Sequence, residues 1–362
     1  MAMAPSSAVL ARRLKALAGW PVLAAVALMF YSGQTGYQMF LLQASLCYAI
    51  GAMSIVLVTG WTGQISLAQG TLIGLGAFLM GLYGGVGNDG SHRLPFLLAA
   101  LLVPATVVPL AVIIGIPALR VRGLHFALVT LGIAFALNLM VFTNRTVTGS
   151  VERLNVPRPA VVGTSLASDY RYLILLIVAA AVFGGLLYNI GRSRLGRAMK
   201  ATRDSEVAAS LMGINVAQVK LVSFALAGLF ASFSGALYAG IVGNVYSVFF
   251  SFDVLRSLLL MVMAVIGGLT SVPGAIIGGL LYIHLPDFVG KFASPVVAQI
   301  IAGTGVIGVL VLLPDGIAGL PRQLLDTARK RRIRATPAES LGTDALYALA
   351  SELEPARAGK ER

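Results

Sequence analysis

The sequence predicts an all-α polytopic membrane protein with about ten transmembrane helices, the range being eight to ten. Hydrophobic residues make up 57% of the 362 positions and charged residues only 11%, whereas soluble domains carry roughly 25% charged residues. The mean hydropathy is +0.87. Apolar runs recur at about the 20-residue length that a helix needs to cross a bilayer. Composition and pattern therefore exclude an ordinary soluble protein.

Eight apolar runs are long enough to span a membrane: 18–37, 40–58, 65–83, 95–117, 124–142, 171–190, 219–243 and 296–313. A further apolar stretch, 254–290, is interrupted at 267–274, where glycine and proline favour a break between two shorter helices. We therefore expect ten helices. Eight helices plus a re-entrant pair within 254–290 is the alternative.

The basic residues predict which side of the membrane each loop faces. With the N-terminus inside, 20 of the 27 Lys and Arg residues are cytoplasmic: three before the first span, two at 118–123, six at 191–220 and nine after 313. Because cytoplasmic loops carry the excess of Lys and Arg, both termini are expected in the cytosol. A signal peptide would also start with basic residues, but no clear A-x-A cleavage pattern follows the first apolar run.

This topology divides the chain into three parts. Residues 1–17 form a cytoplasmic basic segment, 18–320 the transmembrane domain with a long cytoplasmic loop at 191–219, and 321–362 a polar cytoplasmic tail. The basic run 329–332 suits an anionic lipid surface next to the membrane. Since topology accounts for the net charge of +13, we expect no nucleic-acid partner.

Several kinds of chemistry are not indicated by the sequence. Cys47 has no second cysteine to pair with, and His92, His125 and His284 are too scattered to suggest a metal site. Neither Gly-Lys pair stands in a phosphate-binding loop, so ATP hydrolysis by that route is excluded. The predicted spans lack a chain of ionisable residues, which disfavours an ion-coupled carrier and a membrane-embedded enzyme.

The loop 191–219 is too long for a simple connection and is predicted to contain a short helix. Asp204 or Ser205 can cap its start, and Gly213 can take the left-handed conformation that ends it. Helical spacing separates a small-residue face from an apolar face: Glu206, Ala209, Ser210 and Gly213 on one, Val207, Leu211 and Met212 on the other. We expect the small-residue face to meet a second protein, with Glu206 available for an ion pair, and the apolar face to rest on the membrane domain.

An alternative interpretation is a helix that lies on anionic lipid, which would suit the basic residues Arg194, Arg197, Lys200 and Arg203. The string Glu206-x-Ala208-Ala209-x-x-x-Gly213 favours the first interpretation, because it resembles the EAA-type loop of ABC importer permeases. In that loop a short coupling helix docks into the ATPase subunit.

Three further segments stand in the order found in one family of such permeases: Gly-Trp-Thr-Gly-Gln-Ile-Ser-Leu at 60–67, the segment 119–131 and the segment 267–274. Over roughly residues 41–320 the chain resembles a LivM-type permease, the inner-membrane subunit of binding-protein-dependent importers of branched-chain amino acids. Related members of the family transport urea and short amides, so these solutes are alternatives to branched-chain amino acids. A self-sufficient carrier or channel is a further alternative.

The resemblance implies a membrane subunit that is not an enzyme and needs no cofactor or metal. It implies as partners two cytosolic ABC ATPase subunits, a second homologous permease of LivH type, an extracytoplasmic substrate-binding protein and a small polar solute. Such a transporter works by alternating access in the bacterial inner membrane. The chain departs from the family at 148–154, where a Gly-rich motif is replaced by Thr-Gly-Ser-Val-Glu-Arg-Leu. We expect this change to reshape an external loop.

Two groups of candidate site residues follow. The ATPase-coupling residues are expected to be Arg197, Asp204, Glu206, Ala208, Ala209 and Gly213. The candidates for a polar translocation pathway are Gln64, Ser66, Gln69 and Thr130, although hydrogen bonding between helices explains these residues at least as well. Small residues spaced four apart, as at Gly274 and Gly278, predict close helix packing.

Overall fold

The computed structural model describes residues 36–86, 94–121, 123–142, 156, 158, 160–161, 164–165, 168–243, 254–291 and 316–319. They belong to the compact unit Met1–Ala318, apart from Gly319, which begins a second unit, Gly319–Arg362. Several expectations lie outside these residues: the segment 1–17, the first span except for its last two residues, the span 296–313, the tail 321–362, the departure at 148–154 and His92.

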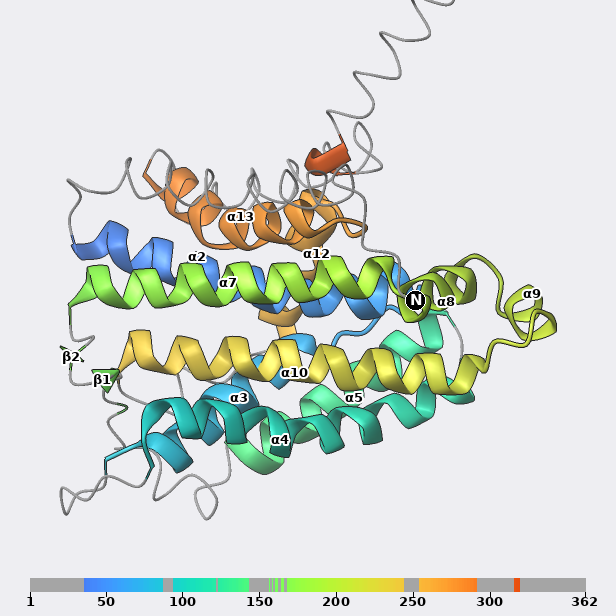
Figure 1. Cartoon of the computed structure of the whole chain (residues 1–362), viewed down its shortest axis with the longest axis horizontal. Coiled ribbons are helices and arrows are strands. Elements are labelled where there is room, and N and C mark those ends of the chain that lie inside the picture. Colours follow the sequence, from blue (N-terminus) through green and yellow to red (C-terminus); the bar gives the residue numbers. More distant parts are fainter. Residues whose placement is uncertain are drawn as a thin grey trace, which may run out of the picture. The chain divides into compact units, whose positions relative to one another are not determined.

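Helices make up most of the described chain (Figure 1). The long helices are α2 (Gly36–Ile55), α3 (Gln69–Gly84), α4 (Phe96–Gly115), α5 (Leu124–Leu137), α7 (Asp169–Arg192), α10 (Val216–Val242), α12 (Val254–Gly267) and α13 (Val272–Gly290). Two short helices, α8 (Arg194–Asp204) and α9 (Glu206–Leu211), connect α7 to α10. The short π and 3-10 turns are η1 (Val56–Trp61), η2 (Ile116–Leu119), η3 (Asn138–Phe142) and η4 (Ile317–Gly319). The strands β1 (Ala160–Val161) and β2 (Thr164–Ser165) form one antiparallel pair.

Five helices in the described residues are long and apolar enough to cross a membrane: Gly36–Trp61, Phe96–Gly115, Asp169–Arg192, Val216–Val242 and Val272–Gly290. Two shorter apolar helices cover His125–Val141 and Ser257–Gly267. The predicted class of polytopic α-helical membrane protein is confirmed, while the number of ten spans stays a prediction. The expected helix 65–83 begins only at Gln69, because residues 62–68 form an irregular turn.

The interrupted stretch 254–290 forms two separate helices, as predicted. Helix α13 lies antiparallel to the whole of α2. At one end the Tyr37 hydroxyl donates to Asp287 Oδ1 at 2.8 Å, and at the other end Gly60 lies against Leu269. By length and composition α13 is suited to cross a membrane, and the choice between two spans and a re-entrant pair in 254–290 stays a prediction.

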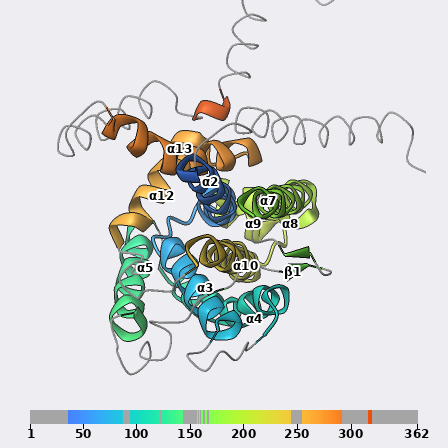
Figure 2. The same cartoon turned by 90° about the vertical axis from the view of Figure 1, so that its left-hand side faces the viewer.

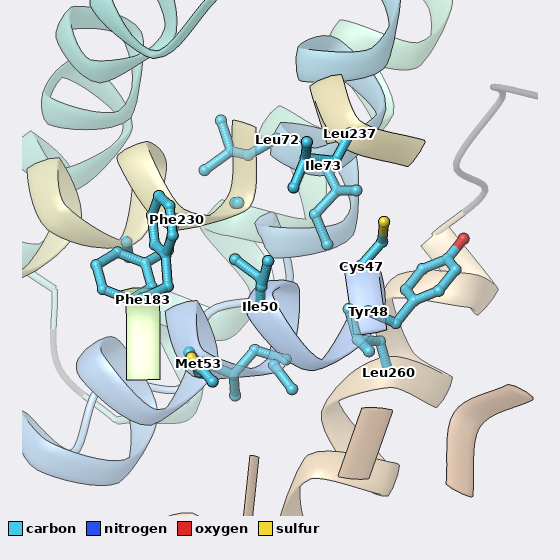
Figure 3. Close-up of a cluster of buried hydrophobic side chains, with 14 of the residues drawn as sticks. Cys47, Tyr48, Ile50, Met53, Leu72, Ile73, Phe183, Phe230, Leu237 and Leu260 are labelled. Carbon is cyan, nitrogen blue, oxygen red and sulfur yellow. The ribbon is translucent and has the colours of Figure 1, made fainter. Parts of the chain in front are cut away.

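Helices α2 and α10 occupy the centre of the unit. Seen end-on in Figure 2, they are flanked by α13 and α7 on one side and by α3 and α4 on the other. In the most apolar window of Gly36–Trp61, 94% of the residues are buried inside the protein. Figure 3 shows the resulting core, in which Ile50 and Met53 of α2 lie among side chains from α3, α7, α10 and α12.

Close backbone approach holds the central helices together. Apolar side chains gain little by leaving lipid for protein, so membrane helices pack through small residues and interhelical hydrogen bonds. Gly76 of α3 lies against the backbone of Ser232, and Gly235 of α10 lies against the backbone of Ile73. In α13, Gly278 packs against Ala264 of α12, at the spacing that predicted such a contact.

Candidate functional site: the coupling loop and the polar turn

The loop 191–219, here called the coupling loop, folds into two consecutive capped helices. Ser193 caps α8, with its Oγ accepting from the Gly196 amide at 3.2 Å. Ser205 caps α9, with its Oγ accepting from the Ala208 amide at 3.2 Å. Gly213 closes α9 at a φ of +79°, a conformation that costs glycine little. The short helix predicted between Ser205 and Gly213 is present, and α8 is an additional helix.

The faces of α9 follow the expectation only in part, because Ser210 and Gly213 of the small-residue face are exposed while Ala209 of the same face is buried. The small residue Ala209 is 2% exposed, whereas Val207, Leu211 and Met212 are 62%, 83% and 80% exposed. The prediction that the apolar face rests on the membrane domain is therefore wrong for the described residues. Sequence spacing separates the two faces of a helix but does not say which one finds neighbours.

Glu206 forms an ion pair within the chain. Its Oε1 lies 2.7 Å from Nζ of Lys220, in the second turn of α10. The Lys220 side chain is 4% exposed and that of Glu206 is 28% exposed. Within the described residues Glu206 therefore pairs with α10, and an ion pair between Glu206 and a second protein stays a prediction.

Of the other predicted coupling residues, Ala209 is buried, whereas Arg197, Asp204, Ala208 and Gly213 are exposed. Arg197 Nη1 donates to the carbonyl oxygen of Arg192 at 2.9 Å, which ties the first turn of α8 to the end of α7. Asp204 Oδ1 accepts from Arg203 Nε at 3.3 Å. Ala208 is exposed next to Val207. The contacts of Arg197 and Asp204 are local, with neighbouring residues of α7 and α8, and they do not bring these residues to a common ligand.

Trp61 joins three segments that are far apart in the sequence. Its Nε1 donates to the carbonyl oxygen of Thr270 at 3.2 Å, in the turn between α12 and α13. The Lys200 ammonium of α8 lies 5.2 Å from the centre of the indole ring. Arg203 Nη1, also from α8, donates to the carbonyl oxygen of Gly60 at 2.9 Å. We call this meeting of α8, η1 and the α12–α13 turn the Trp61 junction.

The chain directly after the Trp61 junction is not helical. Residues 62–68, here called the polar turn, run between η1 and α3. The turn folds back on η1, because the Gln64 amide donates to the Val58 carbonyl at 3.1 Å and Thr59 Oγ1 donates to the Gln64 carbonyl at 3.1 Å. Irregular backbone at membrane depth is tolerated where protein buries it or where it lines a water-filled cavity.

Three of the four pathway candidates carry buried polar atoms without a hydrogen-bond partner in the part of the chain that the structure describes. These atoms are Nε2 and Oε1 of the Gln64 side chain, the Ser66 hydroxyl and Gln69 Nε2. Gln69 Oε1 accepts from Ser54 Oγ at 3.0 Å. Buried polar groups are nearly always hydrogen-bonded, so such exceptions call for water, a solute or a change of conformation.

Thr130, the fourth candidate, has a different position in the network. Its Oγ1 accepts from the Leu67 amide at 3.0 Å and donates to the Ala127 carbonyl at 2.9 Å. Thr130 therefore fixes the backbone of the polar turn against α5.

Three further residues with buried, unpaired polar atoms in the described chain were not among the pathway candidates: Gln38, Thr71 and Ser257. Thr71 Oγ1 and Ser257 Oγ are also buried without a partner in the described residues, and Ser257 of α12 lies against Gly70. Thr71 was not predicted as a pathway residue because it lies within the small-residue pattern Gly70-x-x-x-Gly74, which predicts helix packing. Ser257 is a single hydroxyl among the apolar residues of α12, and one such residue gives no sequence signal of a pathway. Within the part of the chain that the structure describes, no three His, Cys, Asp or Glu side chains are grouped to hold a metal ion.

Comparison with known proteins places these features in a family. The model of the family described as "Branched-chain amino acid transport system / permease component" matches residues 36–312. The permease protein LivM of Escherichia coli K12 is 24% identical over 310 residues, covering 78% of this chain and 70% of LivM. BraD of Pseudomonas aeruginosa is 26% identical over 289 residues, covering 76% of this chain and 92% of BraD.

LivH of Salmonella typhimurium is 25% identical over 289 residues, with 76% of this chain and 92% of LivH covered. The names of LivM, BraD and LivH all describe permease proteins of high-affinity branched-chain amino acid transport systems. No solved structure matches the chain. Since the family match covers well over half of the sequence and includes the coupling loop and the polar turn, this chain belongs to the family of branched-chain amino acid transport permease components.

Proposed function

We propose that this chain is one of two membrane subunits of a binding-protein-dependent ABC importer that carries branched-chain amino acids across the bacterial inner membrane. Two cytosolic ATPase subunits hydrolyse the ATP, so this chain is not itself an enzyme. A second permease of LivH type completes the translocation pathway, and an extracytoplasmic substrate-binding protein delivers the solute. The descriptions of the family and of LivM, BraD and LivH support the solute class.

The exposed apolar face of α9 carries the proposal. Val207, Leu211 and Met212 extend from a short capped helix and are each more than 60% exposed. Large apolar side chains that gather outside a folded body mark an interaction site. An ATPase subunit with an apolar groove would cover them. Arg197, Asp204, Ala208 and the Gly213 turn would then lie at the edge of the same contact.

The polar turn supplies the best candidates for the wall of the translocation pathway. Gln64, Ser66 and Gln69 offer buried hydrogen-bonding groups that the described residues leave unpaired, and a passing zwitterionic solute or its water could pair with them. Thr71 and Ser257 extend this group along α3 and α12. Thr130 contributes by holding the backbone of the turn.

The proposal is tested by co-purifying the chain with its ATPase, permease and binding-protein partners. The Leu211→Asp/Met212→Asp variant should lose the ATPase subunits, because each side chain contributes about 1.5–3 kcal/mol when buried. A loss of about 3 kcal/mol weakens the contact roughly 100-fold. The Gln218→Ala variant, at an exposed polar position of the same loop, serves as the matched control and should retain them.

Transport by the purified assembly in liposomes tests the solute. Uptake of leucine should require ATP and the binding protein, and valine and isoleucine should compete while urea and acetamide do not. If urea or acetamide competes instead, the solute of the importer is urea or a short amide and not a branched-chain amino acid. Leucine uptake by this chain alone, without nucleotide or partners, would show a self-sufficient carrier and overturn the proposal.

A further inference from the structure

We propose that the Glu206–Lys220 ion pair is the link through which a displacement of α9 by the ATPase is passed to α10. This inference rests on the proposed function, because it needs an ATPase subunit that moves α9. It assigns Lys220 as a positioning residue for transport. The sequence comparison with permease loops pointed to Glu206 but gave no indication of its partner on α10.

The ion pair bridges two stretches of chain that the backbone connects only through a turn. Helix α9 is bounded by the extended residue Ser205 at one end and by the non-helical residues 212–215 at the other. The turn at its end bonds back onto α9, since the Ile214 amide donates to the Ala209 carbonyl at 3.1 Å. The contact between Glu206 and Lys220 therefore restricts the movement of α9 relative to α10, which the turn 212–215 alone does not.

The burial of Lys220 makes the contact specific. Its side chain is 4% exposed, while its ammonium group lies 2.7 Å from Glu206 Oε1. A buried ammonium group needs a compensating charge, and an apolar side chain of similar volume often serves stability as well or better. A lysine is thus not required at this position for packing alone. The charge ties α10 to a carboxylate on α9.

Helix α10 can pass such a displacement to the core. Gly228 lies against Ala111 of α4, Gly235 lies against the backbone of Ile73 of α3, and Ser234 Oγ donates to the Cys47 carbonyl of α2 at 2.7 Å. Tightly packed interfaces with few flexible side chains transmit displacement rather than absorb it. Helix α3 begins with Gln69, next to the polar turn.

The neighbouring helix α8 is held separately. Arg203 and Lys200 of α8 contact Gly60 and Trp61 of η1. Helix α9 thus follows α8, which contacts the Trp61 junction, and precedes α10, to which the ion pair connects it. Loss of the pair is expected to leave α9 in place for docking but to weaken its connection to α10.

The test uses the assembled importer in liposomes and measures solute carried per ATP hydrolysed. Lys220→Met should keep the ATPase subunits, a thermal midpoint close to that of the unchanged protein and an ATPase rate within about twofold, while uptake per ATP falls about tenfold. Glu206→Lys and Lys220→Glu should each lower this ratio, and the charge-swapped double variant should restore at least half of it. Lys291→Met, which removes another ion-paired lysine, should leave the ratio unchanged.

Three outcomes would contradict the inference. Lys220→Met with an unchanged ratio of uptake to ATP hydrolysis would show that the pair transmits nothing. Assembled single variants that the charge swap fails to restore would show that the two charges act separately. If the unchanged chain retains no ATPase subunit, the proposed function itself fails and the inference fails with it.

Discussion

Gly60 and Trp61 bring three segments of the chain into contact, each by different means. Trp61 offers one polar atom for a hydrogen bond to Thr270 and a ring face for the Lys200 ammonium. An ammonium over an indole face is attracted by the ring quadrupole. Gly60 offers the absence of a side chain, since a Cβ atom there would overlap the Leu269 carbonyl oxygen. The junction therefore depends on the large side chain of Trp61 and on the absence of a side chain at Gly60.

Replacing Gly60 by alanine should destabilise the protein. The obstructing atom is a backbone oxygen, which cannot rotate away as a flexible side chain would. Overpacking of this kind costs about 1–3 kcal/mol, and we expect the thermal midpoint of the purified protein in detergent to fall by about 5 °C. Gly185→Ala is the matched control, because nothing lies within 4 Å of a Cβ at Gly185. Equal midpoints for the two variants would contradict this account of the junction.

Among the elements, α9 shows which features can be predicted from sequence. The bounds of α9 could be predicted, because a capping serine and a terminal glycine are local signals. The direction of its faces could not, since that depends on contacts with α8 and α10. Helix α8 was not predicted as a separate helix, because the capping signals at Asp204, Ser205 and Gly213 define only α9, whereas the cap of α8 is Ser193. The late start of α3 was missed because Ile65 and Leu67 continue the apolar run, while the turn is held by distant Thr130.

The cap of α9 gives a prediction for this element. Ser205→Ala removes the acceptor for the Ala208 amide, and losing such a cap costs about 1 kcal/mol. We expect the α9 amides to exchange with deuterium about fivefold faster, as followed by mass spectrometry. Ser193→Ala removes the corresponding cap of α8 and should speed exchange in α8 alone. Unchanged exchange in α9 would show that contacts with the rest of the chain, and not the cap, hold it.

The distribution of charge in the unit Met1–Ala318 predicts its orientation in the membrane. Arg192, Arg194, Arg197, Lys200, Arg203 and Lys220 gather at the end that carries α8 and α9. At the other end, Arg158 pairs with Asp169 and Lys291 with Asp287, so the positive charges that the structure describes there are partly balanced. By the positive-inside rule we predict that the coupling loop lies in the cytosol. The composition and the periodicity of apolar runs sufficed to predict the membrane class, whereas the pairing of α13 with α2 arises only from tertiary contacts.

Labelling of introduced cysteines tests this orientation. Ser168 is exposed at the start of α7, and Ser210 is exposed on α9, whereas the natural Cys47 is 1% exposed and should not react. In intact cells, a membrane-impermeant maleimide that reaches the periplasm should label Ser168→Cys and spare Ser210→Cys. In inverted membrane vesicles the pattern should reverse. Labelling of Ser210→Cys from outside would place the coupling loop away from any cytosolic ATPase, and would contradict both the orientation and the role proposed for α9.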